Sequence, residues 1–118
     1  MASLRTAATA KKYEDFLAAG GAKDACPLCE KAAVHEFTYW RILENDFPYD
    51  LFAAKHHMLV PRRHTTGAAL TAGELAELAD IKTDYVNERY EWLMEATPKN
   101  QSLPEHFHLH LIVPKALE

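Results

Sequence analysis

Apolar side chains recur at helical spacing in two stretches of the chain. In residues 9–19 they mark one face of a helix, which Gly20 and Gly21 are expected to stop. In residues 72–89 they follow Thr71 and Glu74, which have the spacing of a capping box that satisfies backbone N–H groups at a helix start. The pattern therefore predicts a short N-terminal helix and a longer second helix. The apolar positions of the first are Tyr13, Phe16 and Leu17.

Shorter stretches are rich in the aromatic, β-branched and other apolar residues that favour strands. Turn residues lie between them at 26–29, 45–48 and 99–104. The order of helix, strands, long helix and strands is typical of an α+β domain with an antiparallel sheet. The predicted strands are residues 37–43, 57–60 (ended by Pro61), 92–94 and 106–113 (ended by Pro114).

Composition places these elements in one globular domain covering residues 1–118. The chain is 48% hydrophobic and 25% charged, which argues against disorder. Its net charge of −4 gives no general attraction to nucleic acid or to an anionic membrane, so any phosphate binding must be local. No apolar stretch approaches the roughly 20 residues of a membrane helix, and no secretory signal is evident. We therefore expect a cytoplasmic protein whose two cysteines are thiols or metal ligands rather than a disulfide.

The pattern with the most chemical content is an alternating histidine run near the C-terminus. In a strand, His106, His108 and His110 project from one face, and apolar side chains project from the other. Three imidazoles in a row need hydrogen-bond partners, a metal or a ligand, so an ordinary core role is a minority explanation. Two chemistries remain open: a metal held by two or three of the histidines, or attack of one neutral imidazole on phosphorus.

Four motifs, in order between residues 26 and 113, resemble the histidine-triad family. Residues 106–112 fit its signature His-φ-His-φ-His-φ-φ, in which φ is apolar. Residues 56–64 resemble its His-x-x-x-x-Pro-Lys-x-His segment, and a Leu-Thr-x-x-Glu-Leu helix start follows at 70–75. Residues 45–48, Asn-Asp-Phe-Pro, resemble its Asp-Ile-Ser-Pro turn.

This resemblance implies a five-stranded antiparallel sheet, a homodimer, and a hydrolase or transferase that acts on nucleotides. By position, His108 would attack the α-phosphorus and form a nucleotidyl-histidine, while His110 and His56 position it and bind phosphate oxygens. Asn45 falls where the family places an acidic residue that contacts the ribose, and Asp46 would help to wall the base pocket. The substrate class implied is a nucleoside phosphoramidate, a dinucleoside polyphosphate or a nucleotide conjugate.

The cysteine pair alone is ambiguous, since Cys-x-x-Cys occurs in redox pairs, in zinc sites and as unrelated thiols. Two distant histidines favour zinc, because a closed structural site needs four nitrogen or sulfur ligands. The resemblance to bacterial members of the family implies that the ligands are Cys26, Cys29, His64 and His106. A redox role is weaker, because the residues before Cys26 look helical rather than like a strand.

The phosphate loop departs from the family pattern. Its Gln lies one position further back, at Gln101, so that either Gln101 and Ser102 together or Ser102 alone would serve the phosphate. Two alternative functions follow: a nucleotide-binding regulatory module without turnover, or a metalloenzyme with its metal on the triad. Arg62 and Arg63, which would face opposite ways on a strand, are interpreted as surface charge.

Overall fold

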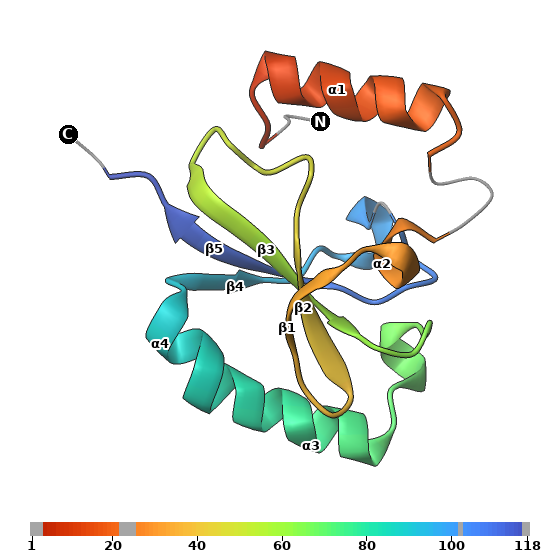
Figure 1. Ribbon diagram of the computed structural model, residues 1–118, viewed down its shortest axis with the longest axis vertical. Helices are drawn as coiled ribbons and strands as arrows, with labels where there is room; N and C mark the ends of the chain where they lie inside the picture. Colours follow the sequence, from red (N-terminus) through yellow and green to blue (C-terminus); the bar gives the residue numbers. More distant parts are fainter. Residues whose placement is uncertain (1–3, 22–25, 102, 117–118) are drawn as a thin grey trace.

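The computed structural model describes residues 4–21, 26–101 and 103–116. As predicted, it is an α+β domain with a five-stranded antiparallel sheet (Figure 1). The strands lie side by side in the order β1-β2-β3-β5-β4, so β1 and β4 are the edges of the sheet. The strands are β1 (Ala33–Glu36), β2 (Trp40–Glu44), β3 (Ala53–Pro61), β4 (Trp92–Met94) and β5 (Leu109–Pro114).

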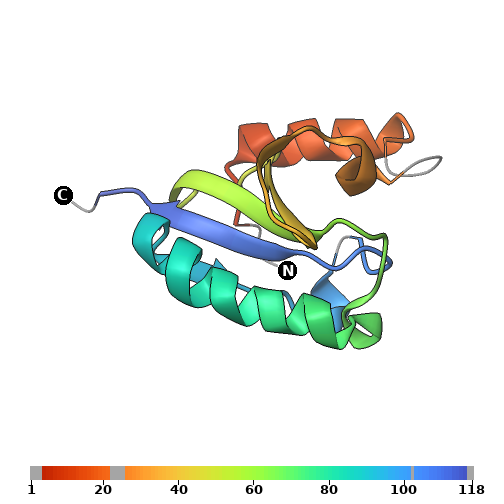
Figure 2. The ribbon, with the colours of Figure 1, turned by 60° about the horizontal axis from the view of Figure 1, so that its bottom comes forward.

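The helices lie on opposite faces of the sheet. Figure 2 shows α1 (Ala7–Ala18) above it and a long helical segment below it. That segment is continuous from α3 (Ala72–Asp80) through a π-helical stretch, η2 (Ile81–Val86), into α4 (Asn87–Arg89), which confirms the predicted bounds of 72–89. The π-helical stretch was not predicted. The described residues also form a four-residue helix, α2 (Pro27–Glu30), and two single 3₁₀ turns, η1 (Gly67–Ala69) and η3 (Pro98–Asn100).

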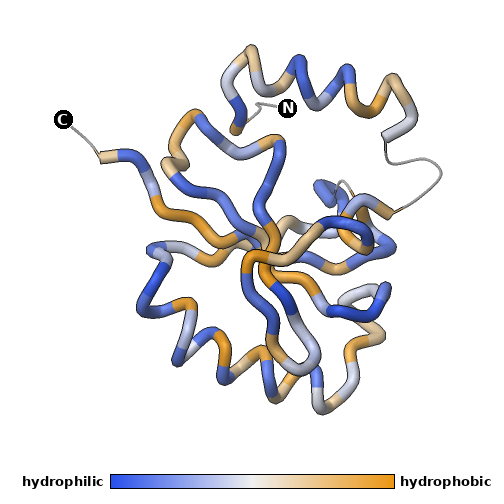
Figure 3. The backbone as a smooth tube through the Cα atoms, in the orientation of Figure 1, coloured by the Kyte–Doolittle hydropathy of each residue, from blue (hydrophilic) through white to orange (hydrophobic). Residues whose placement is uncertain are grey.

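The main hydrophobic core lies between the sheet and the long helix. Alternate strand residues point into it, because side chains of a strand alternate between faces. Figure 3 shows hydrophobic residues converging on the central strands and recurring along the long helix. Full burial of each large apolar side chain contributes about 1.5–3 kcal/mol, so this layer dominates stability. Its buried members are Trp40, Ile42, Leu59, Leu78, Ile81, Val86, Leu109 and Leu111.

The opposite face of the sheet is mixed rather than apolar. A small cluster of Leu28, Leu43, Met58 and Val60 is buried there beside α2. The remaining positions of β3 and β5 on this face include His56 and His110, which are 4% exposed. The sheet thus separates an apolar layer from a layer that combines apolar and imidazole side chains.

Both predicted helix ends carry the expected caps. Thr71 and Glu74 form a complete capping box at the start of α3. At the end of α1, Gly20 has φ +82°, and the N–H groups of Gly20 and Gly21 donate to the carbonyls of Leu17 and Phe16. This is the Schellman arrangement, in which a left-handed residue lets two final carbonyls be satisfied, and glycine adopts it without strain.

The strand predicted over 37–43 is wrong in its first half. Residues 37–39 lie in the turn of a hairpin between β1, which was not predicted, and β2. The N–H groups of Thr38 and Tyr39 donate to the Glu77 carboxylate at 3.2 and 2.7 Å. Aromatic and β-branched residues favour a strand locally, but a partner on α3 stabilises the turn instead. No pattern within residues 37–43 could indicate that partner.

Two other strand boundaries differ from prediction. The final strand begins at Leu109 rather than at residue 106, because the N–H groups of His106 and Phe107 donate to Leu103 and Thr65 instead of to a neighbouring strand. The strand predicted over 57–60 extends over Ala53–Pro61, since polar His56 and Lys55 interrupted its apolar pattern. The strand at 92–94 is confirmed.

The interpretation of Arg63 as surface charge is incomplete. Its side chain is 51% exposed, yet Nη2 lies 2.9 Å from Oε1 of Glu74, whose side chain is 4% exposed. Arg63 and the capping box hold the pKa of the Glu74 carboxyl below its ordinary value. Arg62, by contrast, pairs with the exposed Glu36 at 3.1 Å, as surface charges often do.

The hairpin contact gives a first prediction. Glu77→Ala should lower the free energy of unfolding by about 1–2 kcal/mol, because two turn N–H groups lose their acceptor. Urea unfolding followed by circular dichroism measures this. Asp80→Ala, which removes an exposed carboxylate from the same helix, is the control and should change stability by less than about 0.5 kcal/mol. Equal effects of the two variants would contradict the proposed role of Glu77.

Candidate functional site

The pairing of β3 with β5 brings two histidines together on the mixed face of the sheet. In its register Ile112 lies opposite His56, and His110 lies opposite Met58, so the two imidazoles are diagonal neighbours. Nε2 of His56 lies 2.8 Å from Nδ1 of His110, and both rings are buried. Tyr49 lies against both rings, with centroids 4.5 Å from His56 and 4.9 Å from His110.

Backbone contacts decide which nitrogen of each neutral ring carries the proton. The Tyr49 N–H donates to Nδ1 of His56 at 2.9 Å, so the His56 proton is on Nε2. That Nε2–H donates to Nδ1 of His110, which places the His110 proton on Nε2, 3.4 Å from the Tyr49 hydroxyl. The backbone amide of Tyr49 thus fixes the tautomer of His56 directly and that of His110 through His56.

His108 has the opposite tautomer. Its Nδ1 lies 3.1 Å from the carbonyl oxygen of His106, and a carbonyl can only accept, so Nδ1 carries the proton. Nε2 therefore keeps a lone pair, and within the described part of the chain it makes no hydrogen bond. The ring is 8% exposed and lies edge-on to His110, with centroids 5.2 Å apart.

These imidazoles are neutral at neutral pH. Burial, followed by the charges of Arg5, His57 and His108, lowers the pKa of His56 to about 4. Burial, followed by the charge of His56, lowers the pKa of His110 to about 3. Burial also lowers the pKa of His108. The cluster therefore offers lone pairs and N–H donors, but no positive charge of its own.

A cleft of about 360 Å³ opens over His108 and His110. One part of its wall is polar, with Asn45 and Asp46 from the turn after β2. Its other walls are largely apolar and come from α1, α2, the loop after β2, strand β3 and the segment before β5. They include Tyr13, Phe16, Leu17, Pro27, Leu28, Phe47, Met58 and Leu103.

The ligand atoms of Cys26, Cys29, His64 and His106 all lie within 4.8 Å of one another, as the sequence predicts for a metal site. Sγ of Cys29 lies 3.2 Å from Nδ1 of His64, and both sulfurs lie 3.3 Å from Nδ1 of His106. Nε2 of His106 donates to the Pro61 carbonyl at 3.0 Å, so its Nδ1 lone pair points at the sulfurs. This cluster could hold a metal ion.

A side chain on the sheet holds the turn that carries the cysteines in place through hydrogen bonds. Arg41 on β2 donates to the carbonyls of Lys31 at 2.7 Å, Leu28 at 2.5 Å and Cys29 at 3.1 Å. These are carbonyls at and after the end of α2, which has no following turn to satisfy them. Burial, followed by the hydrogen bond and charge of Cys26, raises the pKa of the Cys29 thiol to about 11. A bound cation would relieve this by stabilising both thiolates.

The structure gathers most of the predicted residues and leaves Gln101 apart. His108, His110, Asn45 and Asp46 line the cleft, and His56 lies directly behind His110. Gln101 does not line it; its Nε2 donates to the Ala96 carbonyl at 3.4 Å. Ser102 lies outside the described residues.

Sequence reasoning missed two contributors to the site, Tyr49 and Arg5. Tyr49 sets the tautomers through its backbone amide, which no side-chain pattern can signal. Arg5 lines the cleft from the segment before α1, and its Nε donates to the carbonyl of Phe47, 42 residues away. The sequence showed the helical periodicity of Tyr13, Phe16 and Leu17, but it gave no sign that this face of the helix lines a cleft.

In comparisons with known proteins, no family model and no curated protein matches the chain. No helix in the described ranges is long and apolar enough to cross a membrane. The functional assignment therefore depends on the geometry of the two clusters.

The buried histidines predict acid sensitivity. The folded-state pKa of His110, about 3, lies below its ordinary value of 6.5, so the unfolded chain takes up a proton first as the pH falls. The resulting loss of folding stability is absent above about pH 6.5 and grows as the pH falls toward 3. Unfolding free energies measured from pH 7 to 4 should therefore decrease more steeply for the wild type than for His110→Asn. Acid release of a metal affects both proteins alike, so identical slopes would contradict the prediction.

Proposed function

We propose that this chain is a nucleotide hydrolase or transferase of the histidine-triad type, with a fold of that family. It would cleave at the α-phosphate of a nucleoside phosphoramidate, a dinucleoside polyphosphate or a nucleotide conjugate. The observation that carries the proposal is that His108 lines the cleft with a neutral ring whose Nε2 makes no hydrogen bond to any described residue. The ordered motifs of the sequence support the same assignment.

In the first step the Nε2 lone pair of His108 attacks the α-phosphorus, and the bond from phosphorus to the leaving group breaks. The ring gains positive charge as the new phosphorus–nitrogen bond forms. Its Nδ1–H bond to the His106 carbonyl then becomes charge-assisted and stronger, so this contact stabilises the transition state more than the ground state. Water, or another acceptor, attacks phosphorus in the second step and releases His108.

The neighbouring groups have complementary roles in this proposal. His110 offers Nε2–H to a phosphoryl oxygen, and His56 keeps that tautomer by donating to Nδ1. Asn45 accepts the Phe47 N–H at Oδ1 (2.8 Å), and its Nδ2, which lies 3.3 Å from Nε2 of His56, would donate a hydrogen to a ribose hydroxyl. Asp46 would wall the base pocket, and Gln101 and Ser102 would serve the phosphate.

The Cys26, Cys29, His64 and His106 cluster fits a structural zinc ion. Two thiolates and two imidazoles are the donor set that zinc prefers, and four protein ligands close the coordination sphere. The orientation of His106 by the Pro61 carbonyl is the support a ligating imidazole usually has. His106 would then hold the start of the triad segment in place, while His108 and His110 remain available for chemistry.

One observation favours the alternative of a nucleotide-binding module without turnover. Gln101 is bonded to the Ala96 carbonyl instead of lining the cleft, so the phosphate loop lacks one expected donor in this conformation. We also propose a homodimer, for which the edge strand β4 offers Trp92, 61% exposed, as an apolar contact.

The enzymatic assignment predicts that His108→Asn lowers kcat/KM by at least about 10⁴-fold, as removal of a catalytic nucleophile does. Release of AMP from a fluorogenic adenosine phosphoramidate measures this. His57→Asn is the matched control, since His57 is on the same strand as His56 but bonds to Tyr90 (2.6 Å) on the helix-covered face. Unchanged activity of His108→Asn would refute the mechanism, and nucleotide binding without turnover in the wild type would favour the regulatory module.

The metal assignment predicts one zinc ion per chain in the purified protein. Cys29→Ser should reduce zinc content to near zero and lower the melting temperature, because metal-binding free energy contributes to folding. His110→Asn should retain the zinc. The reverse pattern, with metal lost from His110→Asn and kept by Cys29→Ser, would place the metal on the triad and support a metalloenzyme.

A further inference from the structure

The cleft has an electrostatic requirement that its histidines do not meet. A phosphoryl group is anionic, while the imidazoles of His56 and His110 have lowered pKa values and are neutral at pH 7. Three carboxylates also line the described part of the cleft, Glu30, Glu44 and Asp46. A cation would therefore strengthen the binding of an anion there beyond what neutral donors provide.

Two cationic side chains line the described part of the cleft, Lys31 and Arg5. Nζ of Lys31 lies 2.6 Å from Oδ1 of Asp46, so its charge is balanced locally by that carboxylate. Arg5 comes from the segment just before α1. It contacts the ring of Tyr49, which packs against His56 and His110, so Arg5 is the cation that these contacts connect to the histidine pair.

The guanidinium of Arg5 is held next to the histidine pair. Its Nε donates to the Phe47 carbonyl at 2.7 Å, and its Cζ lies 4.4 Å from the ring centroid of Tyr13 and 5.0 Å from that of Tyr49. Tyr49 in turn packs against His56 and His110. The positive charge of Arg5 also contributes to the lowered pKa of both histidines, so its field reaches the site.

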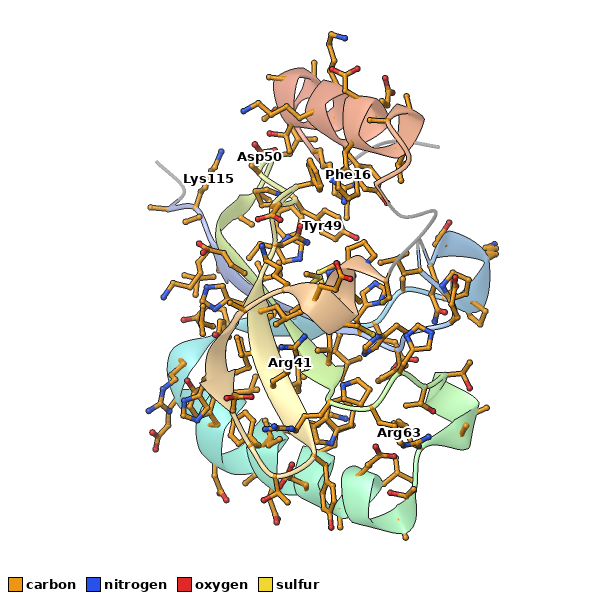
Figure 4. The ribbon with its side chains drawn as sticks, turned by 45° about the vertical axis from the view of Figure 1, so that its right-hand side comes forward. Phe16, Arg41, Tyr49, Asp50, Arg63 and Lys115 are labelled. Atoms are coloured by element: carbon orange, nitrogen blue, oxygen red, sulfur yellow. The ribbon has the colours of Figure 1, made fainter. Side chains whose placement is uncertain are left out.

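The backbone that presents Arg5 is anchored independently of the cleft. Asp50 accepts the N–H of Thr6 at 2.8 Å and the hydroxyls of Thr6 and Thr9 at 3.2 and 2.5 Å. These bonds hold the pKa of the Asp50 carboxyl below its ordinary value and fix the first turn of α1. Figure 4 shows Asp50 beside α1, with Phe16 on the side of that helix nearer Tyr49.

We propose that Arg5 binds the anionic phosphoryl group of the substrate, so that the N-terminal segment is part of the active site. The proposal rests on the proposed function for the identity of the ligand as a nucleotide. The guanidinium of Arg5 has a fork of N–H donors that suits a phosphoryl group, and its contacts with two tyrosine rings hold it in position before a ligand binds. The site is then divided, with bond-making at His108, just before β5, and charge recognition on the segment before α1.

Isothermal titration calorimetry with AMP, adenosine and inorganic pyrophosphate tests this. Arg5→Gln should weaken AMP and pyrophosphate binding by about 10- to 100-fold, the loss expected for a charge-assisted contact, and leave adenosine within about twofold. It should also flatten the salt dependence of AMP binding. Arg5→Lys, which keeps the charge but not the fork, should recover part of the affinity. Lys12→Gln, an exposed position on α1, is the control with the same loss of charge.

The possible outcomes separate the role of Arg5 from the proposed nucleotide function. Unchanged AMP affinity in Arg5→Gln, or equal loss of AMP and adenosine, would overturn the role of Arg5 and leave the proposed function standing. Pyrophosphate binding that depends on Arg5, without AMP binding by the wild type, would support Arg5 and contradict the nucleotide assignment. No anion binding by the wild type would overturn both. Thermal unfolding of each variant confirms that it is folded.

Discussion

The antiparallel register of β3 against β5 is the constraint on which the site depends. It places Leu59 and Leu109 toward the long helix and His56 and His110 toward the other face. Imidazoles that are buried in this way lose hydration, so each nitrogen needs a partner or an opening to solvent. No buried side-chain nitrogen or oxygen among the described residues lacks a hydrogen-bond partner. The fold therefore determines the protonation pattern as well as the positions of the rings.

The histidine run is consequently not uniform. Its three rings alternate along one segment, but each meets a different partner. His106 donates to Pro61 and turns its free nitrogen toward the cysteine sulfurs, whereas His110 accepts from His56. His108 bonds to a backbone carbonyl through Nδ1, which leaves Nε2 unprotonated, and its side chain lines the cleft. One run of alternating residues thus contains three rings with different hydrogen-bond partners, because different chain segments lie beside each ring.

Local patterns predicted the parts of the fold whose stabilising contacts are local. The long helix and its capping box are examples, since Thr71 and Glu74 lie three residues apart and bond to each other's backbone. The motif resemblance also indicated four residues that could hold a metal ion, and the structure brings them together. The hairpin at 37–39 could not be predicted, because Glu77 stabilises it from α3. Arg5 and Tyr49 were missed for the same reason: their roles depend on backbone groups and rings far along the chain.

The central claim is that backbone contacts set the tautomers so that His108 alone presents an unprotonated nitrogen to the cleft. Nuclear magnetic resonance of the protein labelled with ¹⁵N in its histidine rings measures this directly at pH 7, since protonated and unprotonated ring nitrogens have distinct shifts. The account predicts a proton on Nδ1 of His108 and on Nε2 of His56 and His110. A His108 ring protonated at Nε2, or charged at both nitrogens, would contradict it.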